Sequence, residues 1–317
     1  MLKNSKIYVA GHRGLVGSAL VRALQSRGYT NIIARTHREL DLLDQKAVMS
    51  FFEQEKPEYV FLAAAKVGGI LANSDYPAEF IYQNTMIGFN IIHAAYTFRV
   101  QKLLNLGSTC IYPKMAEQPI KEEYLLTGLL EPSNDAYSLA KISAIKLCTA
   151  YNKQYGTNFL SVMPTNLYGI GDNYDLENSH VLPALIRKFH EAKVSGSNEV
   201  VLWGDGSPLR EFLYSDDLAS IAVSLMEERN AVDIRNNAGD FINIGSGKEV
   251  SIKQLADMIR SVVYGKESIC RITWDASKPN GTPRKLCDLT RLSKLGYTAH
   301  TDLCEGIQRA YQDFLYR

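Results

Sequence analysis

The sequence lacks any large excess of charge: 35 lysine and arginine residues stand against 34 aspartate and glutamate residues, which gives a net charge of +1. Proteins that bind nucleic acids or anionic membrane surfaces usually carry a basic excess, so the composition gives no electrostatic argument for either partner. The longest apolar run, residues 59–65, is far shorter than the roughly 20 residues that a membrane span takes. We therefore expect neither nucleic acid nor a membrane as a partner.

The sequence also lacks paired cysteines and an N-terminal leader. Its five cysteines are an odd number without a Cys-x-x-Cys pair, which argues against a disulfide framework and against a zinc site. The first residues, Met1–Lys6, contain no apolar signal region. These features predict a soluble protein of a reducing compartment, the cytoplasm, that holds no metal.

The first half of the chain alternates short β-rich runs with amphipathic helical stretches. This alternation is typical of a parallel sheet with crossover helices, so we predict an α/β fold with a Rossmann-like, doubly wound parallel sheet. The expected strands are Lys6–Ala10, Asn31–Arg35, Tyr59–Ala63, Lys102–Gly107 and Phe159–Met163, and the expected helices are Leu15–Arg27, Gln45–Glu55, Pro77–Arg99 and Asp135–Tyr155.

The pattern changes after Gly169, where a polar loop precedes a further set of strands and helices. We expect a Rossmann domain over residues 1–168, with a return segment near 210–245, and a smaller α/β substrate domain over 169–209 and 246–317. The elements expected after Gly169 are helices at Val181–Ala192, from Asp216, at Ser251–Tyr264 and from Asp302, and strands at Glu199–Trp203, Arg210–Tyr214, Phe241–Gly245 and near Ile272, of which those between residues 210 and 245 belong to the return segment.

A glycine-rich loop, Gly11–Gly17, follows the first expected strand and opens the first helix. Its G-x-x-G-x-x-G spacing allows a tight turn, close approach of backbone N–H groups to a pyrophosphate, and close packing of helix on sheet. The positive end of the helix then faces the phosphates. Three glycines are also compatible with a purely structural loop, but the position inside a βαβ unit favours a dinucleotide site.

The end of the second expected strand discriminates between cofactors. An acidic residue there would accept hydrogen bonds from an adenosine ribose, whereas this sequence has Arg35, His37 and Arg38. Positive charge at this point, together with Arg13 in the glycine loop, suits the extra 2′-phosphate of NADP. A solvated basic turn is the alternative, and we expect NADP(H) as the cofactor.

A tyrosine and a lysine, Tyr137 and Lys141, lie four residues apart near the start of an expected helix, so both project from the same face. We expect the ammonium to lower the pKa of the tyrosine and make it a usable general acid. Ser108 follows the fourth expected strand, where an α/β sheet keeps its ligands, and its hydroxyl could hold the same carbonyl oxygen.

Together these residues resemble the extended short-chain dehydrogenase/reductase family, in the branch that acts on sugar nucleotides. Further motifs over nearly the whole chain resemble those members that convert GDP-4-keto-6-deoxy-D-mannose to GDP-L-fucose. The motifs are residues 10–17, 63–69, 82–84, 107–114, 163–169, 178–180, 210–213, 275–279 and 281–285.

The resemblance implies a bifunctional reaction, 3,5-epimerisation followed by NADPH-dependent reduction at C4. Cys110 and His180 would form the acid–base pair of the epimerisation, with Cys110 taking the proton, since thiols and imidazoles both titrate within reach of neutral pH. We expect Cys110 to lie two positions after Ser108 on the same side of an extended strand. The other four cysteines, and His93 and His190, are expected to be structural.

The resemblance also implies two sets of binding residues. Those around NADP(H) are Gly11, Arg13, Gly14, Leu15, Val16, Gly17, Arg35, His37, Asp41, Leu42, Ala64, Leu106, Gly107, Lys141, Pro164, Asn166 and Leu167. Those around the nucleotide of a GDP-sugar substrate are Lys188, Trp203, Arg210, Lys278 and Asn280. Three positions depart from the family pattern: Lys188 replaces an arginine, Asn280 replaces an aspartate, and His37 stands where a more basic residue is common.

Two other activities remain to be weighed. A sugar-nucleotide 4-epimerase that retains NAD would carry an acid at the end of the second strand and needs no Cys/His pair, and a catalytically dead NADP-binding regulator would have lost the tyrosine or the lysine. The residues favour neither. We also expect a homodimer that pairs through a four-helix interface formed by residues 79–99 and 135–155 of each subunit.

Overall fold

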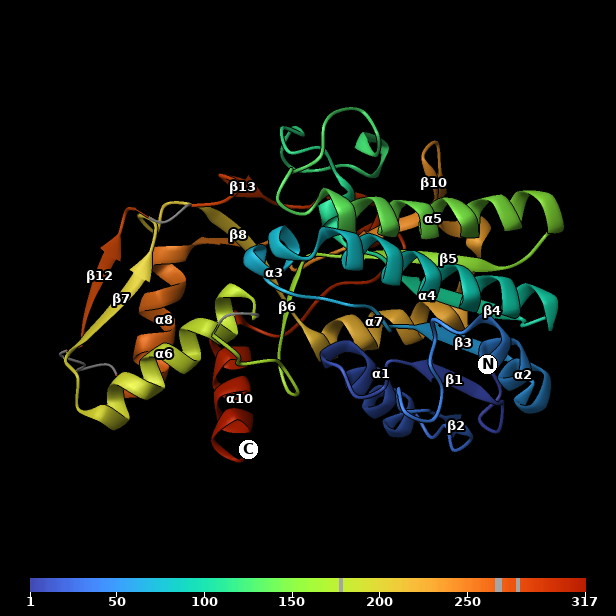
Figure 1. The fold of residues 1–317 in the computed structure, drawn as a ribbon, viewed down its shortest axis with the longest axis horizontal. Helices are drawn as coiled ribbons and strands as arrows, with labels where there is room; N and C mark the ends of the chain where they lie inside the picture. The colour runs from blue at the N-terminus through green and yellow to red at the C-terminus, as the bar shows by residue number, and fades with distance from the viewer. Residues whose placement is uncertain (177–178, 266–269, 278–279) are drawn as a thin grey trace.

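A central seven-stranded sheet forms the larger part of the computed structural model, which describes residues 1–176, 179–265, 270–277 and 280–317 (Figure 1). Its strand order is β2-β1-β3-β4-β5-β10-β9, and all of its pairs are parallel except that of the edge strand β9. The strands are β1 Ile7–Ala10, β2 Ile32–Ile33, β3 Tyr59–Leu62, β4 Lys102–Leu106, β5 Phe159–Pro164, β10 Gly239–Ile244 and β9 Arg235–Asn236. The predicted doubly wound parallel sheet is confirmed.

Helices cover both faces of this sheet, which explains why β1, β4 and β5 are buried along their whole length. One face packs against α1 (Leu15–Ser26) and α7 (Ser215–Glu228). The other face packs against α2 (Gln45–Glu55), α4 (Pro77–Thr97) and α5 (Asp135–Tyr155). Figure 1 shows α4 and α5 lying side by side across the sheet.

A second region, at the left of Figure 1, contains the remaining strands. A four-stranded sheet joins β6, β8, β11 and β13, and a separate parallel pair joins β7 and β12. The strands are β6 Asn166–Tyr168, β7 Glu199–Trp203, β8 Leu209–Tyr214, β11 Glu249–Ser251, β12 Arg271–Asp275 and β13 Arg284–Lys285, and the helices are α6 Val181–Ser195, α8 Ile252–Tyr264 and α10 Leu303–Leu315. These helices share one hydrophobic core with β7 and β8.

The chain passes between the two regions more than once. After β8 it returns to the central sheet through α7, the 3₁₀ turn η3 (Ala231–Ile234) and β10. Near its end, the short helix α9 (Thr290–Lys294) packs Leu292 into the core of the central sheet. The segment between β4 and α5 contains the 3₁₀ turn η2 (Glu122–Tyr124), and it pairs Ile120 with Leu286 and Asp288 through backbone hydrogen bonds of 2.7 and 2.8 Å.

One local prediction is wrong. We expected Ser108 and Cys110 to lie on one side of an extended strand, but β4 ends at Leu106 and Thr109–Ile111 form a 3₁₀ turn, η1. The hydroxyl of Ser108 caps this turn by accepting a hydrogen bond of 3.4 Å from the backbone N–H of Cys110. A small polar side chain that bonds to nearby backbone competes with strand geometry, and here it ends the strand.

Candidate active site

The glycine loop between β1 and α1 is held so tightly that side chains would not fit at two of its positions. Gly11 has a φ of 83°, and a Cβ there would lie 2.7 Å from the backbone of Ala64. A Cβ at Gly17 would collide with the carbonyl oxygen of Gly11. The N-cap of α1 is Gly14, which offers no side-chain cap, so the first N–H groups of the helix are open to an anionic ligand.

A large open cavity of about 610 Å³ lies beside this loop. Its lining carries guanidinium and imidazole groups but no carboxylate, which fits a phosphate ligand. Arg35 also forms an ion pair of 2.5 Å with Glu55, so part of its charge is already balanced inside the protein. The lining residues are Gly11, His12, Arg13, Gly14, Arg35, Thr36, His37 and Arg38.

The other predicted cofactor residues lie near this loop or at the carboxyl ends of β3, β4 and β5, where an α/β sheet keeps its ligands. Leu15, Val16 and Gly17 continue from the loop into α1, and Asp41 and Leu42 follow the basic turn without being among the residues that line the cavity. Ala64, Leu106, Gly107, Pro164, Asn166 and Leu167 lie at or just beyond the strand ends. The side chain of Asn166 donates a hydrogen bond of 2.8 Å to the carbonyl of Glu211, which orients it from β8.

Tyr137 and Lys141 extend from the start of α5 toward the end of β4. The ammonium of Lys141 donates a hydrogen bond of 2.8 Å to the carbonyl of Leu106 and lies 5.6 Å from the ring centroid of Tyr137. Burial lowers the pKa of Lys141 to about 8, although negative charge on Cys110 acts in the opposite direction.

The expectation that Lys141 lowers the pKa of Tyr137 is wrong. Burial raises the pKa of this phenol, and negative charge on Cys110 raises it further. Desolvation of the phenolate therefore decides the direction of the shift. The phenol keeps its proton at neutral pH, which suits a group that donates a hydrogen bond or a proton to a carbonyl oxygen.

Cys110 lies at the centre of these groups. Only 7% of the residue is exposed, and its carbonyl accepts a hydrogen bond of 2.9 Å from the hydroxyl of Ser138 on α5. Charge on its thiol acts on Tyr137, Lys141 and Lys285, so all three lie within electrostatic reach of the sulfur. The structure thus brings Ser108, Cys110, Tyr137 and Lys141 together, as the sequence predicts.

His180 occupies the N-cap position of α6. The residue is exposed to solvent, although the protein around it lowers the pKa of the imidazole by desolvation. The loop before it is fastened to α10, because the hydroxyl of Tyr174 donates to the carbonyl of Ala310 at 2.9 Å and the N–H of Gly171 donates to Asp313 at 3.0 Å. The pairing of His180 with Cys110 stays a prediction.

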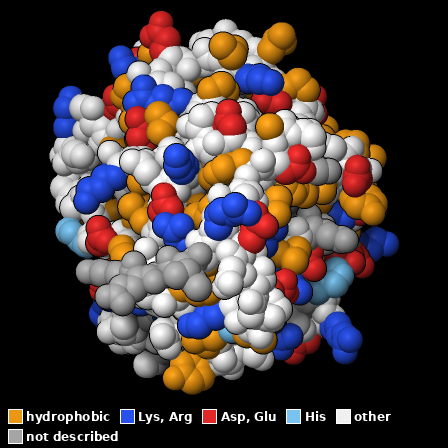
Figure 2. Space-filling view, turned by 90° about the vertical axis from the view of Figure 1, so that its left-hand side faces the viewer, with side chains coloured by type: hydrophobic (Ala, Val, Ile, Leu, Met, Phe, Trp, Pro, Cys, Tyr) orange, Lys and Arg blue, Asp and Glu red, His pale blue; other side chains and the backbone are white. Residues whose placement is uncertain are grey.

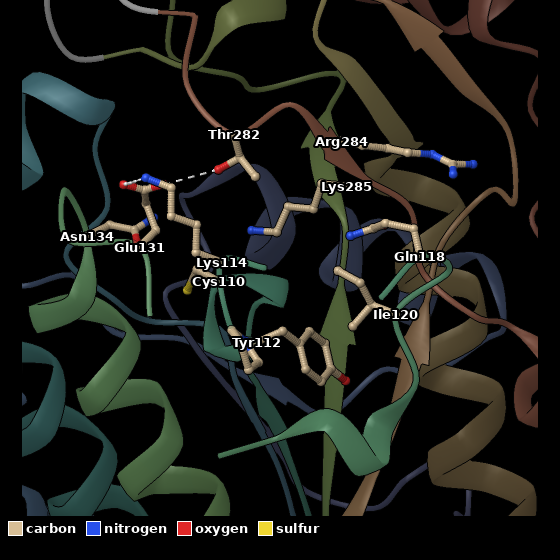
Figure 3. Close-up of a pocket in the computed structure, with 11 residues that line it drawn as sticks. Cys110, Tyr112, Lys114, Gln118, Ile120, Glu131, Asn134, Thr282, Arg284 and Lys285 are labelled. Atoms are coloured by element: carbon tan, nitrogen blue, oxygen red, sulfur yellow. Dashed lines mark hydrogen bonds and ion pairs between the residues drawn. The ribbon is translucent and has the colours of Figure 1, made fainter. Parts of the chain in front are cut away.

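A second, small cavity of about 40 Å³ opens beside Cys110 (Figure 3). Its lining combines segments that are far apart in the sequence: Cys110, Tyr112, Pro113, Lys114, Gln118, Ile120, Glu131, Asn134, Thr282, Arg284 and Lys285. Lys114 and Glu131 form an ion pair of 3.1 Å at one side of it. Cys110, Tyr112 and Lys114 belong to the motif 107–114, and Thr282, Arg284 and Lys285 to the motif 281–285, but apart from Cys110 none of them was given a role, and the sequence did not indicate Gln118, Glu131 or Asn134.

The predicted nucleotide-binding residues occupy the second region. Lys188 on α6 places its ammonium 5.5 Å from the ring centroid of Trp203, which is 48% exposed and hence not the core residue it could have been. Burial lowers the pKa of Arg210 on β8. The amide oxygen of Asn280 accepts a hydrogen bond of 2.9 Å from the N–H of Asp205, so it supports the Gly204–Gly206 turn. Lys278 lies outside the described residues.

The two histidines expected to be structural have side-chain partners: the ring nitrogen Nδ1 of His93 lies 2.8 Å from the hydroxyl of Tyr151, and that of His190 lies 3.0 Å from the hydroxyl of Tyr311. The face seen in Figure 2 mixes Lys and Arg with Asp and Glu side chains over the described residues. Within the described part of the chain, no helix is both long and apolar enough to cross a membrane, and no three His, Cys, Asp or Glu side chains are placed to hold a metal ion.

A Rossmann-like sheet with a glycine loop at its first turn, and a Tyr/Lys pair beside a strand-end serine, defines a short-chain dehydrogenase/reductase type of site. The chain matches the "NAD dependent epimerase/dehydratase family" over residues 7–245 and belongs to this family.

Individual relatives match nearly the whole chain and are more specific than the family. The chain is 56% identical over 313 residues to the putative GDP-L-fucose synthase 2 of Arabidopsis thaliana, covering 99% of this chain and 92% of that one. It is 52% identical over 316 residues to the GDP-L-fucose synthase of Escherichia coli strain K12, covering 99% and 98%. Among solved structures, the GDP-mannoheptose C4 reductase of Campylobacter jejuni with NADP bound has a TM-score of 0.89 and 40% identity, covering 99% of each chain.

Proposed function

We propose that this protein is an NADPH-dependent 3,5-epimerase-4-reductase that converts GDP-4-keto-6-deoxy-D-mannose to GDP-L-fucose. The observation that carries the proposal is the placement of the Cys110 thiol within electrostatic reach of Tyr137 and Lys141. A simple ketone reductase needs only the tyrosine and the lysine. A buried thiol beside them supplies a base for the carbons next to the ketone.

The ketone of the substrate would be held by Ser108 and Tyr137, which donate hydrogen bonds to O4. Because C3 and C5 flank this ketone, their hydrogens are acidic, and the negative charge that forms on O4 when one is removed is stabilised by the two donors. Cys110 takes the hydrogen as a proton, forming an S–H bond while the C–H electron pair moves into the enolate. His180 returns a proton to the opposite face of the same carbon.

Reduction completes the reaction at C4. NADPH, when bound along the glycine loop, supplies the hydride. Tyr137 transfers its proton to the alkoxide that forms on O4, and the raised pKa of the phenol keeps that proton in place until the alkoxide develops. Lys141, anchored on the carbonyl of Leu106, lies on the same face of α5 and holds the nicotinamide ribose.

The cofactor and the substrate nucleotide would take opposite ends of the site. The basic lining of the larger cavity, with Arg13 and Arg35, suits the 2′-phosphate of NADP(H). In the second region, Trp203 with Lys188 above its ring is suited to stack on guanine, and Arg210 to reach the diphosphate. Asn280 and Lys278 complete the proposed set of substrate-binding residues. On this proposal the cofactor binds to the Rossmann domain, residues 1–168 with the return segment near 210–245, and the substrate nucleotide binds mainly to the remaining, smaller domain.

We also propose a cytoplasmic homodimer that pairs through α4 and α5 into a four-helix interface. These helices pack on each other and carry exposed large apolar side chains on their outer surfaces. Those side chains are Ile81, Tyr82, Phe89, Leu139 and Tyr155. Light scattering after gel filtration should give twice the chain mass, and a stable monomer at micromolar concentration contradicts this interface.

The proposed function is tested by incubating the purified protein with GDP-4-keto-6-deoxy-D-mannose in deuterated water, with and without NADPH. We expect deuterium at both C3 and C5 without NADPH, and oxidation of NADPH only when the substrate is present. A protein that oxidises NADPH but exchanges neither hydrogen is a simple 4-reductase. A protein that retains bound NAD and interconverts C4 epimers without consuming NADPH is the sugar-nucleotide 4-epimerase that the residues disfavour.

A further inference from the structure

Two successive inversions pose a proton-balance problem that the acid–base pair cannot solve alone. In a D-manno pyranose chair, the hydrogens on C3 and C5 are both axial and lie on the same face of the ring. One base must therefore remove both of them, and one acid on the opposite face must return both protons. After the first inversion the base still carries the proton it took and the acid has lost its own, so both must be reset before the second inversion.

The two members of the proposed pair differ in their access to water. His180 is exposed at the start of α6, so it lies nearer to solvent than the thiol does, although the protein around it partly desolvates the imidazole. Cys110 is 7% exposed in its 3₁₀ turn, with Ser138 bonded to its carbonyl. The thiol therefore needs a route by which it can lose its proton while a hexose covers the open side of the site.

The small cavity supplies such a route. At about 40 Å³ it has no room for a sugar, but it can hold a water molecule, which takes about 30 Å³ in the liquid. Cys110 and Lys285 both line it, and Figure 3 shows the Lys285 side chain reaching from β13 toward the wall formed by Cys110 and Lys114. The side chain of Lys114, in the same lining, is 41% exposed, so the cavity that Cys110 lines extends to a group in contact with solvent.

The electrostatics of Lys285 suit a group that changes protonation. Burial lowers the pKa of this ammonium, while negative charge on Cys110 and on Cys287 raises it and the positive charge of Arg210 lowers it. The thiolate form of Cys110 thus favours a protonated Lys285, and protonation of Cys110 removes that support. The two groups are coupled in the direction that a proton transfer between them needs.

We propose that Lys285 is the proton relay that resets Cys110 between the two inversions. This inference rests on the proposed function. Its neutral amine accepts the proton of the Cys110 thiol, so that the S–H bond breaks, an N–H bond forms and the sulfur again carries a lone pair as thiolate. The ammonium then passes a proton to water in the cavity, and the imidazole of His180 regains a proton from solvent. No net charge or electron is lost.

The test uses Lys285→Arg, which keeps the positive charge but cannot become neutral at working pH. The full-length protein is mixed with GDP-4-keto-6-deoxy-D-mannose and NADP⁺ in deuterated water, quenched on a millisecond scale, and the deuterium at C3 and C5 is read by NMR. Wild type should exchange both positions many times per active site. Lys285→Arg should exchange one carbon in a burst of no more than one deuterium per active site, followed by a phase slowed by about 10²-fold.

Two further variants test the role of the amine itself, one by chemical rescue and one as a matched control. Lys285→Ala should show the same burst, and added ethylamine should accelerate its slow phase, because a free amine can enter the space of the lost side chain. Lys121→Met removes a lysine that is exposed in the same segment as Lys114, and it should exchange as wild type does.

Three results overturn the relay. Normal exchange at both carbons in Lys285→Arg shows that positive charge suffices. An equal slowing of the first and second exchange, without a burst, shows that Lys285 acts on the first abstraction or only on binding. A raised KM with an unchanged exchange rate at saturation assigns it to substrate binding. If wild type itself exchanges neither carbon, the proposed function fails and the relay has no reaction to serve.

Discussion

Two cavities among the described residues of this protein are built in opposite ways. The larger, of about 610 Å³, is lined by residues 11–14 and 35–38, two short stretches at the ends of adjacent strands. The smaller, of about 40 Å³, collects its lining from residues 110–120, 131–134 and 282–285. The first site is therefore local in the sequence, whereas the second exists only after the end of the chain has returned to the segment after β4.

The cavities also differ in their chemistry. The larger is open and lined by several permanently charged guanidinium groups, which suits binding of a fixed anion. The smaller contains a thiol, a lysine whose pKa burial lowers, and an ion pair between Lys114 and Glu131. On our proposals, cofactor binding uses the larger cavity and proton transfer the smaller one, so variants in the two cavities should separate the two functions.

The largest effect is expected at the small cavity. Cys110→Ser should lower deuterium exchange at C3 and C5 by about 10²-fold or more, because a serine hydroxyl is far less acidic than a thiol and so rarely forms the anion that takes the proton, while NADPH binding stays unchanged. Tyr137→Phe is the complementary variant: it should lower the rate of NADPH oxidation by a similar factor, and it should lower deuterium exchange by a smaller factor. Exchange is read by NMR and cofactor affinity by fluorescence titration. Unchanged exchange in Cys110→Ser removes the thiol from the mechanism.

A smaller effect is expected at the large cavity. Arg13→Gln should weaken NADPH binding by about 10-fold and leave NADH binding unchanged, because only NADPH carries the 2′-phosphate. Arg35→Gln should have a smaller effect, since Glu55 already balances part of the charge of Arg35. Both dissociation constants can be measured by titration calorimetry. An equal loss of NADH affinity would show that Arg13 holds the loop rather than the phosphate.

A pH effect is expected at Lys141, which lines neither cavity and is 8% exposed. Its pKa in the folded protein is about 8, against an ordinary value of 10.5, so between these values the unfolded chain binds more protons and the free energy of unfolding rises with pH. From about pH 7.5 to about pH 9 the rise should amount to about 1 kcal/mol in the cofactor-free protein, measured by urea unfolding. Lys141→Met should lack this increment, and an identical slope in both proteins contradicts the assignment.

The smallest effect is expected at Asn280, one of the departures from the family pattern. Asn280→Ala should cost about 1 kcal/mol or less of unfolding free energy, because it removes the acceptor of the Asp205 N–H at the Gly204–Gly206 turn. Asn280→Asp keeps an acceptor oxygen and should retain stability. Thermal unfolding of the three proteins measures the difference. A loss in Asn280→Asp as large as in Asn280→Ala would mean that the amide nitrogen matters instead.

Local patterns predicted most of the fold. Helices α2 and α5 have the bounds that the sequence indicated, Gln45–Glu55 and Asp135–Tyr155, because their apolar spacing and their ends are set by neighbouring residues. The strands of the central sheet were also predicted, except the edge strand β9, since β-rich runs between helices have few other arrangements. The glycine loop was recognisable for the same reason: each glycine is needed by contacts within or beside one βα turn.

The errors fall where distant groups compete with local preference. The turn at Cys110 depends on the capping hydroxyl of Ser108 and on Ser138 from α5, and neither contact follows from the apolar run before it. The pKa of Tyr137 depends on how much protein surrounds the phenol, which the spacing to Lys141 does not contain. The lining of the small cavity depends on backbone pairing of Ile120 with Leu286 and Asp288.

Sequence alone was enough for the class of fold and the dinucleotide loop, because these follow from periodicity and from short motifs whose members are neighbours in the chain; the reacting side chains that it indicated stay a proposal. Folding was needed to give those side chains their properties. The turn that carries the thiol depends on Ser138, and the ammonium of Lys141 is held by the carbonyl of Leu106, which are contacts between different elements of the fold. The water-sized space beside the thiol combines residues 110–134 with residues 282–285 from near the end of the chain. Desolvation and cavity shape are set by everything packed around a group rather than by its neighbours in sequence.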